Sequence, residues 1–325
     1  NALTVNLHLM LASFYHPQGK RCKIICEAKA FPSDQYMLQT HLEQRGLNPD
    51  ELVVEVQPRA SEHCIRHEDI ITTIEQTGDD LALLFWGGVN YYTGQVFDMQ
   101  ALTAAAKSVG AMVGFDLAHA AGNVPLQLHH WEVDFACWCS YKYLNSGPGA
   151  IGGVFIHEQH HHSALPRFGG WWGYKKADRF LMQKGFVPIN SAEGWQLSTP
   201  SPLQYAAHEA ALHLFEEAGM DTVFAKSRLM ADYFHFLLAD VQQQYPNALQ
   251  IITPPNAAER GSQVSMLVPK IGKGVFDALA AGGVYADWRE PDVIRMAPVP
   301  LYNSFTEVHT AIQILKGALA NFVRS

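Results

Sequence analysis

Short apolar runs alternate with helical patterns along the first half of the chain, and this alternation limits the possible folds more than any other sequence feature. The apolar runs lie at 23–27, 52–56, 81–86, 111–116 and 133–140, and the helical patterns lie at 34–44, 68–76 and 99–109. Strands that are apolar at nearly every position are typical of a parallel sheet covered by helices on both faces. The sequence therefore predicts an α/β fold with a mostly parallel central sheet flanked by helices.

The pattern changes near residue 200, which indicates a second domain. Two long helical stretches, 203–218 and 221–244, are followed by shorter strands and helices up to residue 323. We interpret this part as a smaller C-terminal α/β domain and predict domains at 1–199 and 200–325. A helical pattern also opens the chain, with Asn1 expected as its N-cap, and this start predicts that an N-terminal segment is missing before Asn1.

Composition and charge exclude several classes of protein. The net charge is −8 and no basic stripe is present, which argues against a nucleic-acid partner. No signal-peptide pattern opens the sequence, and no apolar run approaches the roughly 18 residues of a membrane span. Five cysteines without framework spacing favour free thiols in the cytoplasm. The low charged fraction, 17%, suits either a large compact unit or an oligomer that hides part of its surface.

Two residues that follow predicted strands suggest chemistry. Asp116 ends the run 111–116, and Lys142 comes shortly after the run 133–140. Each alone is most often structural, the aspartate as an N-cap or ion-pair partner and the lysine as an exposed cation. The carboxyl ends of parallel strands are where open α/β sheets bind ligands. Together the two residues offer the amine and the anion that pyridoxal phosphate requires, one for a Schiff base and one beside the pyridine nitrogen.

The same cofactor needs a phosphate site and a stacking partner. The helix that opens at Leu3 and Thr4 offers free N–H groups and a hydroxyl for a phosphate. Phe31, followed by Pro32 and Ser33, can stack on the ring, and Asp34 can accept a hydrogen bond from it.

Three other patterns receive structural interpretations. Gly147, Gly149 and Gly152 match a dinucleotide-binding fingerprint, but a strand follows them instead of a helix, so we expect a tight turn behind Lys142. The adjacent histidines 160–162 cannot easily converge on one ion, so we expect a solvated loop and no metal. Cys137 and Cys139 are expected to be packed thiols.

Arg295 is a charged residue inside an apolar segment, which leaves two alternatives. It is either one half of a buried ion pair or a fork that binds a substrate carboxylate. We favour the second alternative for an enzyme that acts on an amino acid.

Five motifs together resemble the kynureninase family over essentially the whole chain. They are FPSD at 31–34, GFDLAHA at 114–120, CSYKYLN at 139–145, GWWG at 170–173 and RMAPVPLYN at 295–303. The resemblance implies the architecture of fold-type I pyridoxal-phosphate enzymes, in the aminotransferase class V superfamily. It also implies hydrolysis of L-kynurenine to anthranilate and L-alanine, in tryptophan catabolism and NAD biosynthesis. Whether 3-hydroxykynurenine is a substrate stays open.

The resemblance also implies roles for single residues. Lys142 matches the Schiff-base lysine, Asp116 the partner of the pyridine nitrogen, and Tyr141 a phosphate ligand that can assist proton transfer. The remaining cofactor contacts match Leu3, Thr4, Phe31, Pro32, Ser33, Asp34, Gly87, His119, Trp171 and Thr199. Trp171 and Thr199 match contacts supplied by the other subunit of a homodimer, and Arg295 matches the arginine that binds the substrate carboxylate.

Two departures and three rival functions accompany this resemblance. Thr199 stands where some members carry Asn, so its contact is expected to be shorter or water-mediated. Gly87 stands where others carry Ser, so one polar contact is expected to be lost there. The rivals are a cysteine desulfurase, which needs a reactive cysteine such as Cys64, an aminotransferase that shares the first half of the chemistry, and a non-catalytic protein of the same fold.

Overall fold

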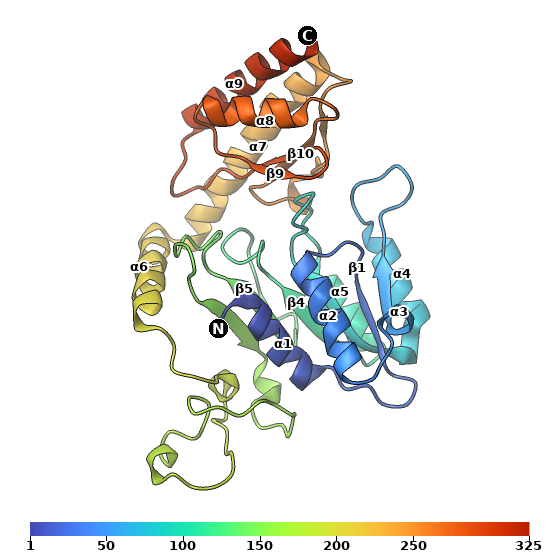
Figure 1. Cartoon of the computed structure of the whole chain (residues 1–325), viewed down its shortest axis with the longest axis vertical. Coiled ribbons are helices and arrows are strands. Elements are labelled where there is room, and N and C mark those ends of the chain that lie inside the picture. The colour runs from blue at the N-terminus through green and yellow to red at the C-terminus, as the bar shows by residue number, and fades with distance from the viewer. Residues whose placement is uncertain (325) are drawn as a thin grey trace. The chain divides into compact units, whose positions relative to one another are not determined.

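The computed structural model describes residues 1–324, which form two compact units (Figure 1). The first unit comprises residues 1–58, 65–88 and 98–213, and the second comprises residues 59–64, 89–97 and 214–325. In the part of the chain that the structure describes, no helix is long and apolar enough to cross a membrane.

The first unit is built on a six-stranded sheet. Its strands are β1 (Lys23–Glu27), β2 (Val53–Val56), β3 (Leu81–Gly87), β4 (Met112–Asp116), β5 (Phe135–Cys139) and β6 (Gly152–Ile156), in the order β2-β1-β3-β4-β5-β6. The first five strands are parallel, and β6 alone runs antiparallel to its neighbour β5. The predicted mostly parallel sheet is confirmed.

Helices cover both faces of this sheet, as the apolar strands require. The helices of the first unit are α1 (Leu3–Phe14), α2 (Pro32–Gln44), α3 (Pro49–Leu52), α4 (His67–Thr77) and α5 (Met99–Ser108). Residues of α1 and α2 pack in one core with Ile24, Leu83 and Phe85. Leu84 and Trp86 alternate with these along β3 and are also buried, on the face that α4 and α5 cover. Short 3-10 turns lie at Gly78–Asp80, Glu158–His160, Arg179–Leu181 and Ala192–Trp195.

The second unit has a smaller antiparallel sheet packed on helices. Its strands are β7 (Gln250–Ile251), β8 (Val264–Leu267), β9 (Asp287–Arg289) and β10 (Val293–Met296), in the order β7-β8-β10-β9. Its helices are α7 (Met220–Gln244), α8 (Gly272–Ala281) and α9 (Phe305–Arg324), and a 3-10 turn lies at Ala257–Glu259. The core joins Phe234 and Leu238 of α7 to Met266 of β8 and Leu315 of α9.

The division into units differs in detail from the predicted boundary between residues 199 and 200. Helix α6 (Pro202–Ala218) runs without a break across the change of unit. Two earlier segments also belong to the second unit, because residues 89–97 are hydrogen-bonded to its loops. The Val96 N–H donates to the Glu259 carbonyl at 2.8 Å, and Gln95 forms a β-bridge with Arg260. Because segments 59–64 and 89–97 belong to the second unit, no single boundary in the sequence describes the division.

The prediction that Asn1 caps the first helix is wrong. Ala2 occupies the capping position of α1 without a side-chain hydrogen bond. The Asn1 carbonyl instead accepts a hydrogen bond from the Gly152 N–H, at 2.8 Å, at the start of β6. This hydrogen bond holds Asn1, just before α1, against β6, which is an edge strand of the sheet.

The prediction of a solvated loop at histidines 160–162 is wrong for His160, which is buried beside Asp134. Asp134 precedes β5 and is fully buried, so its carboxylate needs donors. It accepts hydrogen bonds from His160 Nε2 at 2.7 Å, from the Val113 N–H at 2.7 Å, and from Lys107. Burial raises the pKa of Asp134, but His160 and Lys107 outweigh it, so the pKa lies below the ordinary 3.8.

We expect Asp134→Asn to destabilise the first unit by about 3 kcal/mol at pH 7, because it leaves Lys107 and His160 without their buried anion. Since the folded pKa is depressed, the stabilisation is fully present above the ordinary pKa of 3.8 and is lost as the pH falls through the lower folded value. Urea unfolding of both proteins at several pH values measures the difference. Asp79→Asn, at an exposed pair with Lys20, is the control and should change little. Equal midpoints for Asp134→Asn and wild type would contradict the expectation.

Candidate active site

The carboxyl ends of the central strands bring the predicted site residues together. Asp116 is the last residue of β4, and in the ladder it lies opposite Gly87 of β3 and Cys137 of β5. The chain leaves β5 at Cys139 and reaches Tyr141 and Lys142 directly afterwards. The parallel register therefore places the ends of three strands side by side, as the sequence predicted.

Two buried carboxyl groups share this edge. Asp34, in the first turn of α2, is hydrogen-bonded to Asp116, and both side chains are more than nine-tenths buried. Burial and the charge of Asp116 raise the pKa of Asp34 well above its ordinary value, and the hydrogen bond to Asp116 adds to the effect. Because that bond raises the pKa of Asp34 and lowers that of Asp116, we expect Asp34 to be the protonated member of the pair.

Asp116 is the anion of the pair. Burial is the largest influence and raises its pKa, while the Ala118 N–H at 2.6 Å, the Asp34 carboxyl and the Lys142 ammonium act in the opposite direction. The pKa of Asp116 nevertheless lies above the ordinary value. A further cation beside this carboxylate would lower it.

Lys142 is held on a compact turn that faces Phe31. Its Nζ lies 5.8 Å from the centre of the Phe31 ring, and its carbonyl accepts a hydrogen bond from the Asn145 N–H at 3.0 Å. Asn145, Gly147 and Gly149 all have positive φ, between 56° and 82°. The predicted tight turn behind Lys142 is confirmed, and no helix follows it, because Gly152 begins β6.

Tyr141 belongs to a chain of polar contacts that the sequence did not indicate. Its half-exposed side chain is hydrogen-bonded to Cys139, and burial together with this thiol raises the pKa of Tyr141. The Cys139 thiol lies 3.9 Å from the Ala118 carbonyl, whose own residue donates to Asp116. Cys137 and Cys139 are buried, so the predicted packed thiols are confirmed, but Cys139 also orients Tyr141.

The start of α1 lies beside the end of β5. Gly152 pairs with Cys139 in the sheet, and its N–H donates to the Asn1 carbonyl. A Cβ at residue 152 would lie 2.9 Å from that carbonyl oxygen, so only glycine allows this approach. Leu3 and Thr4, the first residues of α1, are thereby held close to the strand that leads to Tyr141.

The other residues predicted around the ring lie on the same edge. Pro32 is at the start of α2, where its missing N–H costs nothing, and the Ser33 hydroxyl donates to Asp34 at 3.4 Å. His119 follows Asp116 in a turn, and its ring packs edge-on against Tyr143 at 6.0 Å. Gly87 lies opposite Asp116 and carries no side chain that could contact it.

Trp171 and Thr199 lie on an arm, residues 163–200, that has only short 3-10 turns. The Trp172 N–H donates to the Leu197 carbonyl at 3.1 Å, so the two stretches that carry Trp171 and Thr199 run together. Both residues are exposed.

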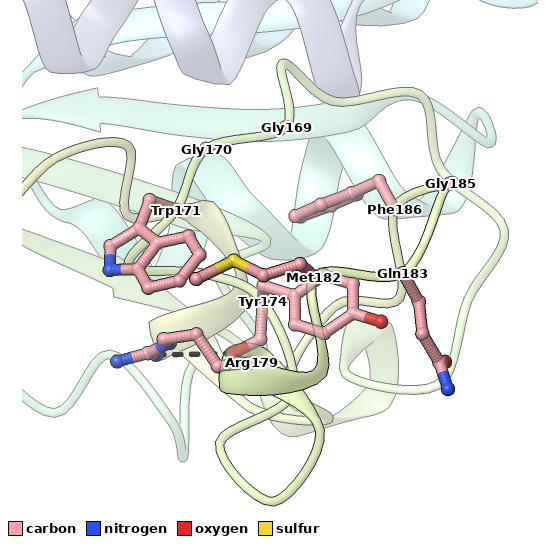
Figure 2. A pocket seen from close by; sticks show the side chains of 9 residues that line it. All are labelled: Gly169, Gly170, Trp171, Tyr174, Arg179, Met182, Gln183, Gly185 and Phe186. Carbon is pink, nitrogen blue, oxygen red and sulfur yellow. Dashed lines mark hydrogen bonds between the residues drawn. The ribbon is translucent and has the colours of Figure 1, made fainter.

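Arg179 organises the arm around Trp171. Its buried guanidinium donates to the Trp172 and Tyr174 carbonyls, at 2.6 and 3.1 Å, and lies 5.9 Å from the Trp171 ring. Figure 2 shows it on one side of a pocket that Trp171, Met182 and Phe186 also line. No sequence pattern indicated Arg179, because its partners are backbone carbonyls.

Arg295 belongs to the second unit, on strand β10. Its side chain is 8% exposed and donates to the Asp287 carboxylate and to the Tyr91 carbonyl. Of the two alternatives left open by the sequence, the structure therefore shows the ion pair, and binding of a substrate carboxylate by Arg295 stays a prediction.

The residues at the strand ends fit pyridoxal phosphate. A buried carboxylate with a raised pKa suits a cationic ring nitrogen, and the partly exposed face of Phe31 beside Lys142 suits an aromatic ring. The start of α1 offers N–H groups and a positive dipole end for a phosphate.

Known proteins of one family resemble this chain over nearly its whole length. A family model described as the kynureninase C-terminal domain matches residues 223–315. A kynureninase from Flavobacterium johnsoniae is 53% identical over 97% of this chain and 75% of its own length. One from Xanthomonas campestris is 49% identical over 96% and 74%.

Solved structures share the fold at low identity. A cysteine desulfurase from Thermococcus onnurineus NA1 has a TM-score of 0.80 with 18% identity, covering 98% of this chain and 78% of that one. A ureidoglycine–glyoxylate aminotransferase from Bacillus subtilis has a TM-score of 0.69 with 16% identity, covering 99% and 79%. These confirm the fold-type I architecture. The identity of about one half over nearly the whole chain is far more specific, and it shows that this protein belongs to the kynureninase family.

Proposed function

We propose that this protein uses pyridoxal phosphate to hydrolyse L-kynurenine to anthranilate and L-alanine. The observation that carries the proposal is the buried, hydrogen-bonded carboxyl pair of Asp34, in α2, and Asp116, at the end of β4, near Lys142. Kynureninase relatives at about 50% identity support the same reaction. The name of the family also places the reaction in tryptophan catabolism.

The cofactor supplies an electron-accepting ring that makes the substrate Cα acidic and Cβ a leaving centre. Asp116, whose ionised form is favoured by hydrogen bonds from Asp34 and Ala118, would hold a positive charge at the ring nitrogen. Phe31 would cover one face of the ring, and the first turn of α1 with the Thr4 hydroxyl would bind the phosphate.

Lys142 and Tyr141 are the groups that move protons. The Lys142 amine would remove the proton from the substrate Cα, because it is the amine at the carboxyl ends of the strands, facing Phe31. Water then adds to the γ-carbonyl, the Cβ–Cγ bond breaks to release anthranilate, and Cβ gains a proton. Tyr141, oriented by Cys139, is a phosphate ligand and a proton donor at this end of the site.

The structure disfavours the desulfurase alternative. Cys64 is half-buried, and burial raises the pKa of its thiol to about 11, so it is a poor nucleophile at neutral pH. Cys26, Cys137 and Cys139 are buried with raised pKa values. Cys22 precedes β1 and so lies at the amino ends of the parallel strands, whereas Lys142 follows β5 at their carboxyl ends.

The first test is anthranilate release, followed by fluorescence, when L-kynurenine is added to the purified protein with pyridoxal phosphate and no keto acid. We expect release in the wild type and a loss of at least about a thousandfold in Lys142→Ala, because the variant lacks the proton-transfer amine. Turnover that needs a keto acid would instead identify an aminotransferase. A Lys142→Ala protein that still releases anthranilate would overturn the assignment.

The asymmetry of the carboxyl pair gives a second prediction. Asp34→Asn should lower kcat/KM by less than about threefold, since an amide N–H can donate to Asp116 as the protonated acid does. Asp116→Asn should lower it on the order of a hundredfold, because it removes the anion itself. Steady-state kinetics and the visible absorption of the bound cofactor measure both effects. Equal losses in the two variants would show that the proton is not held by Asp34.

We further propose a homodimer in which Trp171 and Thr199 complete the site of the other subunit. The arm that carries them exposes Phe168, Phe180, Leu181 and Met182, each at least 62% exposed. An apolar surface of this size on a chain with few charges favours burial against a second copy.

Mixing of inactive variants tests the shared site. Trp171→Ala and Lys142→Ala should each be inactive alone, but hybrid dimers hold one intact site. An equal mixture, refolded together, should recover about a quarter of the wild-type activity. Absence of recovery, with hybrid dimers shown by mass spectrometry of tagged subunits, would place Trp171 in the site of its own subunit.

We also propose a cytoplasmic location. All five cysteines are free thiols in the structure, which suits a reducing compartment.

A further inference from the structure

Three charged residues meet on one face of the small sheet in the second unit. Asp287 of β9 lies directly opposite Arg295 of β10, and Arg289 lies two residues further along β9, on the same face. The Oδ2 atom of Asp287 accepts hydrogen bonds from Arg289, at 2.9 Å, and from Arg295. One carboxylate oxygen therefore bridges two guanidinium groups.

The two arginines differ in burial. The Arg295 side chain is 8% exposed, whereas those of Arg289 and Asp287 are 37% and 44% exposed. Arg295 also donates through Nη1 to the Tyr91 carbonyl, and the Tyr91 ring lies 6.0 Å from both guanidinium carbons. Its two terminal nitrogens are thus oriented by one backbone acceptor and one carboxylate.

Electrostatics make the bridge necessary. Two guanidinium groups on neighbouring positions of one sheet face repel each other, and the repulsion is strong where one of them is buried. The carboxylate between them converts this repulsion into two attractions and leaves one net positive charge on the face. That charge matches a single incoming carboxylate.

We infer that Asp287 is a positioning residue for Arg295, which it holds in the orientation that receives the substrate α-carboxylate. The inference rests on the proposed function and on the resemblance that matches Arg295 to the arginine binding that carboxylate. Without the Asp287 carboxylate, Arg289 repels Arg295. Of the two acceptors described above for Arg295, only the Tyr91 carbonyl then remains. Asn at this position can accept a hydrogen bond from one arginine, but it carries no charge to hold both.

Asp287→Asn provides the test. We expect KM for L-kynurenine to rise on the order of tenfold, because a misplaced fork weakens carboxylate binding, while kcat stays within about twofold. Inhibition by the kynurenine analogue that lacks the α-carboxylate should be unchanged, since this ligand does not use Arg295. A merely structural defect would weaken both ligands.

Two further variants serve as a rescue and as a control. Asp287→Glu retains the charge and should recover most of the lost affinity. Asp277→Asn removes an exposed carboxylate from the same unit, where it pairs with Lys273, and should leave KM unchanged. An Asp287→Asn protein with unchanged or lower KM, or with equally weakened binding of the analogue, would overturn the inference.

The same experiment separates this inference from the proposed function. If the wild type releases no anthranilate, or if Arg295→Gln leaves KM unaltered, the proposed substrate site is wrong and the inference falls with it. If the wild type is active and Arg295→Gln raises KM but Asp287→Asn does not, only the role of Asp287 is wrong.

Discussion

The burial of carboxylates at the two edges of one sheet is the constraint on which the first unit depends. A charged group removed from water destabilises the fold unless donors or cations compensate it. Asp134 precedes β5, at the amino ends of the strands, and Asp116 is the last residue of β4, at their carboxyl ends. Two neighbouring strands therefore place one buried carboxylate at each end. The surroundings of these two carboxylates differ in how fully protein groups compensate the buried charge.

Asp134 is fully compensated by protein groups. His160, Lys107 and the Val113 N–H bring its pKa below the ordinary value in spite of complete burial, and the result is a fixed joint between strand, helix and loop. Asp116 is compensated less, because its nearest partner is a second carboxyl, Asp34, that has to keep a proton. The raised pKa of Asp116 is therefore the mark of an anion that a cationic ligand would stabilise.

Position along the chain predicted much of this arrangement. Asp116 and Lys142 could be recognised because each follows a strongly apolar strand, and the parallel sheet then brings the strand ends together. His160 was misjudged because its partner, Asp134, lies in a different element, and sequence alone does not show which loop returns to which strand end. Cys139, Arg179 and Asp287 were missed for the same reason, since their roles depend on register and on backbone acceptors. The roles of Trp171 and Thr199 rest on resemblance and on exposure.

Each of the two units contains two like ionisable groups that are joined directly or through a shared partner. At the strand ends of the first unit, one hydrogen bond joins two carboxyl groups, and on the small sheet of the second unit, one carboxylate joins two guanidinium groups. In each arrangement a neighbouring group acts on the charge indirectly, Asp34 through its hydrogen bond to Asp116 and Arg289 through the Asp287 carboxylate that it shares with Arg295.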